Sequence, residues 1–294
     1  MRVAAAQYPI EAHADRLSWQ TKLARWVGEA AAERAELLLF PEYGAMEMVS
    51  LLPSEIQRDL GRQLVALQDL LPDFIETHRA LAQRFGVHIV AASFPVHLPD
   101  GSFRNRAHIL APDGSVHFQE KLVMTRFETE EWGVSAGEEI RVFETALGRI
   151  GIAVCYDVEF PLIGRALVEA GADVILAPSC TDTEAGYERV RIGARARALE
   201  NQCFVVQAPT VGDADWSPAV DRNVGRAGVY APIDRGFPSD GVLAEGQLNR
   251  AQWLFADLDP AALGRVRADG QVLNHRDWPR QHARCRYPAT LIEL

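Results

Sequence analysis

Short apolar runs alternate along the chain with longer stretches of helical periodicity. In the first of these stretches the apolar positions recur every three or four residues, at Leu23, Trp26, Val27, Ala30 and Ala31. The helical stretches predict a helix capped near Asp15, a helix or broken pair over 54–84, and further helices at 160–170 and 184–201. The apolar runs predict strands at 3–8, 36–40, 88–93, 107–111, 115–119, 141–144, 149–154, 173–177, 203–207, 228–230 and 252–257.

Several of the predicted strands are apolar at every position. The sequence is Leu-Leu-Leu-Phe at 37–40 and Val-Ile-Leu-Ala at 174–177. Such runs are typical of strands covered on both faces, and their alternation with helices is typical of a layered α/β domain. Gly and Pro gather between 209 and 246, but large apolar residues continue through that stretch. We therefore predict one domain over 1–294, with a long ordered loop region at 209–246 near a site or an interface.

Composition and charge narrow the class of protein. The 294 residues are 48% hydrophobic and 24% charged, as in ordinary globular chains. There are 30 Lys and Arg residues against 40 Asp and Glu, and this balance of −10 argues against nucleic acid or an anionic membrane surface as a partner. The N-terminus shows no leader-like apolar segment, and no apolar run is long enough to span a membrane. We expect a cytoplasmic protein.

The cysteines and histidines favour neither disulfides nor a metal site. The eight histidines include no H-x-x-x-H or H-E-x-x-H pair, and the four cysteines include no C-x-x-C pair. We expect no metal, no cofactor and free thiols at Cys155, Cys180, Cys203 and Cys285.

Reactive residues directly follow three of the predicted strands. They are, in chain order, Glu42, Cys155, and the group Ser179, Cys180 and Thr181. Taken singly, each fits a plainer role, because a carboxylate after a strand is often a cap and an apolar-flanked cysteine is often inert core filling. Ligands of open α/β sheets bind at the carboxyl ends of strands. Three reactive strand ends together predict one shared site.

The residues that follow Cys155 distinguish it from a core cysteine. Pro161 suits the first turn of a helix, and Asp157 or Glu159 suits the cap, so Cys155 is expected near a helix N-terminus. That position predicts a lowered thiol pKa, and a nearby ammonium group would lower it further. Lys121 is the candidate ammonium group. The pattern leaves open whether Lys121 reaches Cys155 or is an ordinary solvated lysine.

Three short motifs occur in order along the chain. They are Phe-Pro-Glu at 40–42, Glu-Lys-Leu at 120–122 and Val-Cys-Tyr-Asp at 154–157. Together they resemble the Glu, Lys and Cys motifs of the nitrilase superfamily of carbon–nitrogen hydrolases. Supporting matches include the opening strand at 2–7, Asn105, and the helical stretch at 197–201. The resemblance therefore extends over most of the chain.

The resemblance implies a fold and an assembly. The fold is an α/β, four-layer αββα sandwich in which two sheets face each other with helices outside. The assembly is a homodimer or higher homo-oligomer, formed through outer helices and the C-terminal segment at about 260–294.

The resemblance also implies roles for the motif residues. Glu42 acts as the general base, Cys155 is the nucleophile, and Lys121 stabilises an oxyanion together with the backbone N–H of Tyr156. The expected substrate is a small-molecule amide, cleaved through a thioester intermediate.

Members of this superfamily carry a second Glu between the Lys and the Cys. Three glutamates are available, at 128, 130 and 131. Counting back six residues from Ala136 selects Glu130, with Glu128 as the runner-up. The selected residue is expected to orient Lys121 or to bind the substrate.

The sequence after Cys155 bears on the substrate. Tyr156 and Asp157 stand where the nitrile-hydrolysing branch has Trp and Glu, which favours an amide or carbamoyl-amide over a nitrile. The stretch 178–183 resembles an amidase-like, little-characterised subgroup whose members include some with an extra N-terminal acetyltransferase-like domain. No such domain is expected here, because the first strand begins at residue 2. The candidate substrate-binding residues are Trp132, Ser179, Cys180 and Tyr187.

Other functions remain open at this point. A different thiol hydrolase would pair its cysteine with a histidine, for which His275 and His282 are the most accessible candidates. An amide synthase or acyltransferase would use the same thioester with a different acceptor. A non-catalytic member would keep the fold and bind a metabolite.

Overall fold

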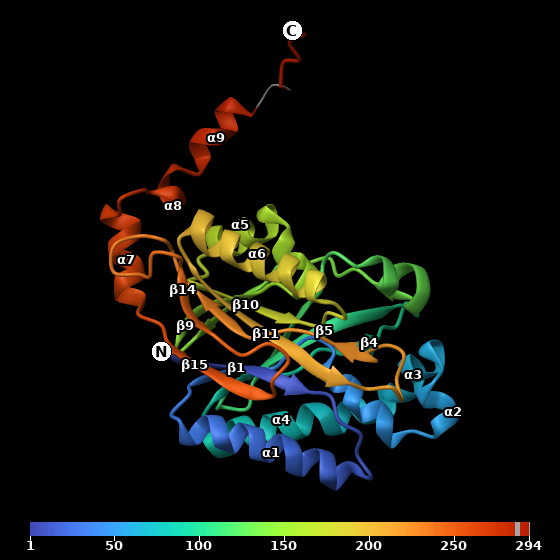
Figure 1. Cartoon of the computed structure of the whole chain (residues 1–294). Helices are drawn as coiled ribbons and strands as arrows, with labels where there is room; N and C mark the ends of the chain where they lie inside the picture. The colour runs from blue at the N-terminus through green and yellow to red at the C-terminus, as the bar shows by residue number, and fades with distance from the viewer. Residues whose placement is uncertain (286–288, 294) are drawn as a thin grey trace.

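The computed structural model describes residues 1–285 and 289–293, which form two facing β-sheets with helices on both outer sides (Figure 1). In the first sheet the strands run in the order β15-β1-β2-β3-β5, and β4, β6 and β7 also pair with β5. These strands are β1 (Arg2–Pro9), β2 (Leu37–Leu39), β3 (His88–Val90), β4 (Phe94–His97), β5 (Phe103–Leu110), β6 (Val116–Glu120), β7 (Val134–Ser135) and β15 (Gln252–Asp257).

The second sheet has the order β8-β9-β10-β11-β13-β14, and the short β12 pairs with the end of β11. It meets the first sheet where β1 and β11 run parallel, with Tyr8 beside Thr210 and Pro9 beside Val211. The strands are β8 (Val142–Thr145), β9 (Gly148–Ile152), β10 (Val174–Ser179), β11 (Phe204–Asp213), β12 (Arg222–Asn223), β13 (Gly228–Tyr230) and β14 (Val242–Glu245).

Helices complete the four layers. Helices α1 and α4 lie on the outer side of the first sheet, and α5 and α6 lie on the outer side of the second (Figure 1). This is the αββα arrangement that the motifs implied. The α-helices are α1 (Arg16–Ala32), α2 (Ser54–Gln57), α3 (Leu60–Leu67), α4 (Leu71–Phe85), α5 (Pro161–Glu169), α6 (Glu184–Asn201), α7 (Pro260–Asp269), α8 (Asn274–Asp277) and α9 (Pro279–Arg284). Short helical segments of other types are η1 (Gly44–Leu51), η2 (Gln68–Leu70), η3 (Phe127–Trp132) and η4 (Cys155–Glu159).

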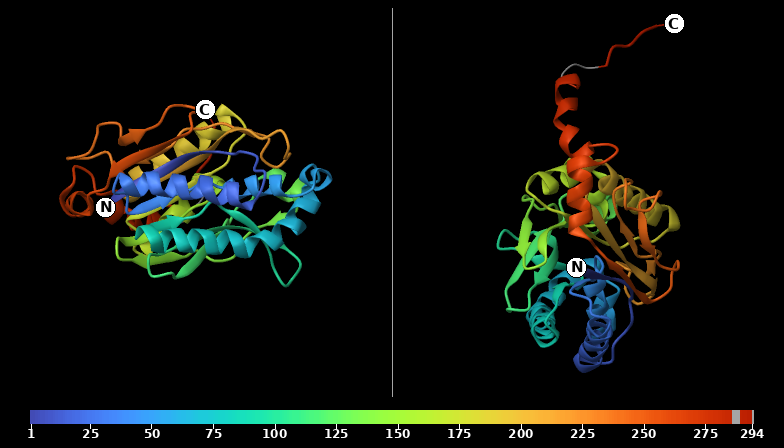
Figure 2. Two further views of the ribbon diagram at one scale, coloured as in Figure 1. Left: turned by 90° about the horizontal axis from the view of Figure 1, so that it is seen from below. Right: turned by 90° about the vertical axis from the view of Figure 1, so that its left-hand side faces the viewer.

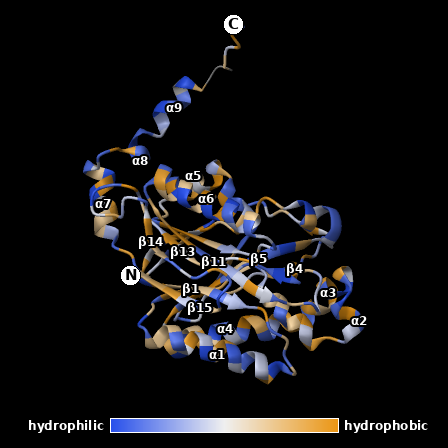
Figure 3. Ribbon diagram, viewed as in Figure 1, coloured by the Kyte–Doolittle hydropathy of each residue, from blue (hydrophilic) through white to orange (hydrophobic). Residues whose placement is uncertain are grey.

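The continuous apolar strands are buried on both faces. Along β1, Val3 and Ala5 belong to the core cluster that contains the strands of the second sheet, whereas Ala4 and Ala6 belong to the cluster beneath α1 and α4. Because side chains alternate across a strand, an apolar run supplies both layers at once. In Figure 3 the helices carry both hydrophilic and hydrophobic colours, as expected for elements with one face in solvent.

Local signals located most elements, including the break within 54–84 and the strand at 228–230, and the region 209–246 contains more strand than expected. Helix α6 has the predicted bounds, and Asp15 caps α1 by accepting from Ser18 N. The stretch 54–84 is broken, because Asp59 caps a separate helix α3 and a further turn precedes α4. The expected loop region at 209–246 contains the end of β11, the short β12, and the antiparallel strands β13 and β14. That stretch therefore extends the second sheet.

The C-terminal helices leave the body of the molecule. Helix α7 packs on it through Ala262, Leu263 and Val266, while α9 projects away (Figure 2). Residues 286–288 and 294 of the segment expected at an interface lie outside the described residues. Within the part of the chain that the structure describes, no helix has the length and apolar character needed to cross a membrane.

Candidate active site

Glu42 lies just beyond the end of β2, where the sequence placed it. Phe40 still pairs with the neighbouring strand through Val90 O, and Pro41 then ends the pairing. The Glu42 side chain is 1% exposed. One carboxylate oxygen accepts from Asn105 Nδ2 at 2.9 Å, and the other accepts from the backbone N of Cys180 at 3.0 Å. Contacts from both sheets therefore fix this carboxylate.

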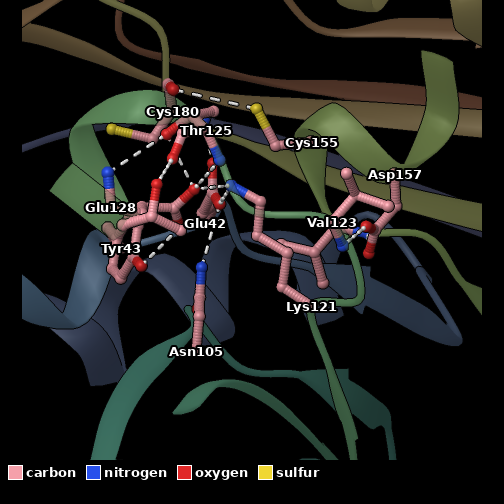
Figure 4. Close-up of polar contacts among 12 residues, drawn as sticks. Glu42, Tyr43, Asn105, Lys121, Val123, Thr125, Glu128, Cys155, Asp157 and Cys180 are labelled. Atoms are coloured by element: carbon pink, nitrogen blue, oxygen red, sulfur yellow. Dashed lines mark hydrogen bonds and ion pairs between the residues drawn. The ribbon is translucent and has the colours of Figure 1, made fainter. Parts of the chain in front are cut away.

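Lys121 follows β6 and is buried rather than solvated. Its Nζ donates to Glu42 Oε1 at 2.8 Å and to Glu128 Oε2 at 2.6 Å (Figure 4). Its backbone N–H donates to Asn105 O, and its carbonyl oxygen accepts from Gly137 N at 2.7 Å. A Cβ at Gly137 would lie 3.1 Å from that carbonyl oxygen, so glycine permits the close approach.

Besides Glu42, the glutamate that contacts Lys121 is Glu128, which the residue count had ranked second. The prediction that Glu130 orients Lys121 is therefore wrong. Glu128 also accepts from Tyr43 Oη at 2.7 Å and from Thr125 N at 2.9 Å. Glu130 is exposed and pairs with Arg126 at 2.8 Å. The two glutamates lie on the wide helical turn η3, where residues two positions apart do not face the same way. Counting residues along the chain could not reveal this orientation.

Cys155 lies after β9, facing the carbonyl group at the end of β10. Its backbone is in the left-handed region, with φ of 50°, which is uncommon for a residue with a side chain. The thiol is 3.8 Å from Cys180 O, and the residue is 4% exposed. Figure 4 shows its sulfur facing the Cys180 carbonyl oxygen, whereas the Cys180 sulfur points away from it.

The predicted lowering of the Cys155 pKa is wrong. Burial raises this pKa well above its usual range, the negative charge of Glu42 raises it further, and Lys121 opposes the shift only in part. The long helix α5 begins at Pro161, and Cys155 belongs to the separate five-residue turn η4. The raised pKa favours a protonated Cys155 thiol, which would need a base in order to act as a nucleophile.

The charges of the cluster suit Glu42 to be that base. Burial raises the pKa of Glu42, Lys121 lowers it, and the negative charge of Glu128 raises it again, so that the net shift is upward. Burial alone would lower the pKa of Lys121, but Glu42 and Glu128 outweigh burial and keep it well above its usual range. A buried carboxylate of raised basicity thus lies beside a permanent positive charge.

The remaining predicted residues divide into two groups. Cys180 and Tyr156 are half-buried beside the cluster, with the Cys180 thiol 3.5 Å from Asn223 Oδ1 and the Tyr156 ring packed on Phe160. The other three are buried and make internal contacts. They are Trp132 (with Leu60 O and the Tyr43 ring), Ser179 (with Ala208 O) and Tyr187 (with Arg226 Nε).

Two polar residues of the cluster had no role assigned from the sequence. Tyr43 was not singled out, although it directly follows Glu42, and Asn105 was noted only as a supporting match to the family. Tyr43 contacts Glu128 and Asn105 contacts Glu42, so both hold carboxylates in place. Among residues 1–285 and 289–293, no group of three His, Cys, Asp or Glu side chains is arranged to hold a metal ion.

Comparison with known proteins gives a consistent result. A family model described as carbon-nitrogen hydrolase matches residues 2–264. A probable hydrolase of Bacillus subtilis, YhcX, is 32% identical over 94% of this chain, and the chain spans about half of that relative, 53% of its length. A deaminated glutathione amidase of Synechocystis is 29% identical, with 84% of this chain and 88% of the relative covered.

Solved structures show the same fold. The Saccharomyces cerevisiae protein Nit3, a member of branch 10 of the nitrilase superfamily, aligns with a TM-score of 0.72 and 21% identity, covering 91% of this chain and 93% of that one. A carbon-nitrogen hydrolase from Helicobacter pylori G27 aligns with a TM-score of 0.74 and 19% identity, covering 97% and 94%. These alignments confirm the sandwich fold.

Proposed function

Because the chain belongs to the carbon–nitrogen hydrolase family and is a hydrolase of carbon–nitrogen bonds, we propose that it cleaves a small amide or carbamoyl-amide through a thioester on Cys155. The observation that carries this proposal is the meeting of Glu42, Lys121 and Cys155 at the ends of strands from both sheets. Acyl transfer from an amide needs a nucleophile, a proton carrier and a stabilised oxyanion, and these side chains supply all three.

In the first half of the reaction, Glu42 takes the thiol proton and the Cys155 sulfur attacks the carbonyl carbon. Lys121 and the backbone N–H of Tyr156 stabilise the negative oxygen of the tetrahedral intermediate. Glu42 then gives its proton to the leaving nitrogen as the C–N bond breaks. The products of this half are ammonia or an amine and an acyl thioester on Cys155.

In the second half, Glu42 takes a proton from water, and the resulting hydroxide attacks the thioester carbon. The C–S bond breaks, the acid is released, and the proton on Glu42 returns to the Cys155 sulfur. The raised pKa of Glu42 supports this double role, because a proton carrier works best when its pKa lies near the working pH. Glu128 contacts Lys121 throughout and is proposed to orient it.

Relatives support an amide as the substrate class. Deaminated glutathione amidases and an omega-amidase of Xenopus laevis are among the matching proteins, the latter 23% identical over 65% of this chain. These names belong to those proteins, and the acyl group of the present substrate is a question for experiment.

The test is ammonia release from a panel of ω-amides, aliphatic and aromatic primary amides, N-carbamoyl amino acids and nitriles. We expect release from amides or carbamoyl-amides in the wild type, and a loss of roughly a thousandfold or more in Cys155→Ala. Cys203→Ala is the matched control, because Cys203 is also a buried thiol but packs against α6 at Arg197 O. Full activity of Cys155→Ala, or an equal loss in Cys203→Ala, would contradict the proposal.

We also propose that the protein acts as a homodimer or higher homo-oligomer in the cytoplasm, with residues 260–294 of its single domain directed to the subunit interface. The outer helices α5 and α6 expose Leu162 (74%) and Ile192 (62%), and the C-terminal segment exposes Leu291 (89%). A nucleophilic thiol also suits a reducing compartment. Light scattering of the full chain should give the mass of at least two chains. A chain truncated after Asp269 should give the mass of a monomer. A monomer in both cases would refute the assembly.

A further inference from the structure

Asp157 is a buried carboxylate that takes no part in the proposed proton transfers. It lies two residues after Cys155 on the turn η4 and is fully buried. Figure 4 shows its side chain directed toward the backbone at Val123, beyond Lys121. The sequence had suggested it as a helix cap and as part of the Cys motif. In the structure it caps η4 through Val154 N and also contacts a different segment of the chain.

The carboxylate joins the two loops that carry the reacting groups. Oδ1 accepts from Leu122 N at 3.1 Å and from Val123 N at 2.8 Å, and Oδ2 accepts from Leu122 N at 3.1 Å and from Val154 N at 3.2 Å. The first two donors come directly after Lys121, and the third comes directly before Cys155. We call these contacts the Asp157 clasp.

The clasp spans the interface between the sheets. Lys121 follows β6 of the first sheet, whereas Cys155 follows β9 of the second. The two strands do not pair with each other, since β6 pairs with β5 and β9 pairs with β8 and β10. No direct strand pairing therefore joins the two loops, which are connected only through the intervening strands of both sheets, and the carboxylate links them directly.

We propose that Asp157 is a positioning residue, whose clasp sets the Lys121 ammonium and the Cys155 sulfur at the separation that the oxyanion intermediate requires. Because the two groups act together only on the tetrahedral intermediate, a change in their separation affects the transition state more than substrate binding. The inference rests on the proposed function of Lys121 and Cys155.

The free-energy cost of burying the Asp157 carboxylate is consistent with a functional role for this side chain. Burial raises the pKa of Asp157 to about 7, even though the backbone N–H donors and the charge of Lys121 favour the ionised form. Keeping a carboxylate in this position therefore carries a cost in folding free energy. An apolar residue would avoid the cost but could not hold the two loops together.

The test is Asp157→Asn, assayed with an amide that the wild type cleaves. Asparagine has nearly the same shape but only one acceptor oxygen, so its NH2 group must face the N–H groups of one loop. We expect kcat to fall roughly 10- to 100-fold while KM stays within about threefold, because a small misplacement of reacting groups acts on the chemical step.

Asp234→Asn is the matched control. Asp234 is 8% exposed and also joins two loops, accepting from Arg235 N at 2.6 Å and Gln271 N at 2.9 Å, but it lies beside the start of the α7–α8 connection. We expect Asp234→Asn to lower the free energy of unfolding, because the amide loses acceptor capacity toward these N–H groups, and to leave kcat unchanged. An unchanged kcat in Asp157→Asn, or an equal fall in both variants, would overturn the inference.

If Asp157→Asn does not fold, a second variant, Asp157→Ser, provides the test. Asp157→Ser keeps one small acceptor oxygen and removes the charge, and we expect the same fall in kcat with unchanged KM in its folded fraction. Wild-type kcat in Asp157→Ser would overturn the inference as well. The proposed function fails separately, since it is refuted by activity in Cys155→Ala whatever Asp157 variants do.

Discussion

Two buried clusters in this protein have nearly the same composition and different consequences. The active-site cluster consists of Glu42, Tyr43, Lys121 and Glu128. The second, which we call the α1 cluster, lies between β1 and α1 and consists of Tyr8, His13, Lys22 and Glu47. In the α1 cluster, Glu47 lies 2.6 Å from Lys22 Nζ, 2.6 Å from Tyr8 Oη and 3.2 Å from His13 Nε2. Each cluster thus contains a carboxylate that accepts from both a lysine and a tyrosine, Glu128 in the active-site cluster and Glu47 in the α1 cluster.

The central carboxylates of the two clusters differ in basicity. Both Glu42 and Glu47 are 1% exposed, so burial tends to raise both pKa values. At Glu47, the charge of Lys22 and the contact with His13 outweigh burial and lower the pKa. At Glu42, Lys121 is shared with Glu128, whose negative charge adds to burial, and the pKa is raised. Lys22 also contacts a second carboxylate, Glu11, at 3.2 Å, but that side chain is 53% exposed, whereas the Glu128 side chain is buried. The comparison teaches that a second carboxylate at one ammonium raises the basicity of the first when both are buried.

The strongest test of this comparison exchanges each central carboxylate for its amide. Glu42→Gln should lose roughly a thousandfold in kcat, since it removes the general base, while the free energy of unfolding changes by less than about 1 kcal/mol. Glu47→Gln should keep kcat and lose about 1.5–3 kcal/mol of unfolding free energy, because it removes a charged acceptor. Amide hydrolysis and urea unfolding measure both quantities. A fall in the kcat of Glu47→Gln, assayed well below the unfolding temperature of the variant, would contradict the comparison.

A smaller effect is expected from the two glutamates of η3. Glu128→Gln should lower kcat roughly 10- to 100-fold, because Lys121 loses a charged partner that orients it. Glu130→Gln is the control, since Glu130 pairs only with the exposed Arg126, and its kcat should equal that of the wild type. Steady-state kinetics of both variants would show which of the two glutamates supports the function of Lys121. The reverse order of effects would restore Glu130 as the functional residue.

The pH dependence of stability should have opposite signs in the two clusters. The folded-state pKa of Glu47 is depressed, so its stabilisation is present above the usual value of 4.5 and is lost as the pH falls through the folded pKa. The folded-state pKa of Glu42 is raised, so its ionised form lowers stability above that folded pKa, and this penalty disappears below 4.5. Urea unfolding at about pH 7 and about pH 3.5 should therefore show the Glu47→Gln deficit shrinking on acidification. A deficit independent of pH would contradict the depressed pKa.

The smallest expected effects come from the two tyrosines. Tyr43→Phe removes the hydroxyl that donates to Glu128, and we expect kcat to fall by a factor of roughly three to ten as Lys121 loses precise orientation. Tyr8→Phe removes the corresponding donor to Glu47 and should lower only the unfolding free energy, by about 1.5–3 kcal/mol. Parallel kinetics and unfolding of the two variants test this. Equal kcat in both would show that Tyr43 does not act through Glu128.

Much of the scaffold could be predicted from local patterns. Helix α6 has its predicted bounds because Thr183 caps it and its residues favour a helix without interruption. The positions of Glu42 and Cys155 followed from the strands that precede them, because an apolar run and the residue that ends it are adjacent in sequence. The strand β14 was missed because its four residues are only half-buried, and its pairing with β13 is a tertiary contact.

The sequence by itself identified the residues that we propose to carry the chemistry, through three motifs and their order along the chain. Only the tertiary structure decided how those residues act on one another. It placed Glu128 rather than Glu130 beside Lys121, raised the pKa of Cys155 by burial, and joined two loops through Asp157. The physical reason is that these outcomes depend on side-chain direction and on charges sharing a medium of low dielectric constant, and both are fixed only when segments remote in sequence pack together.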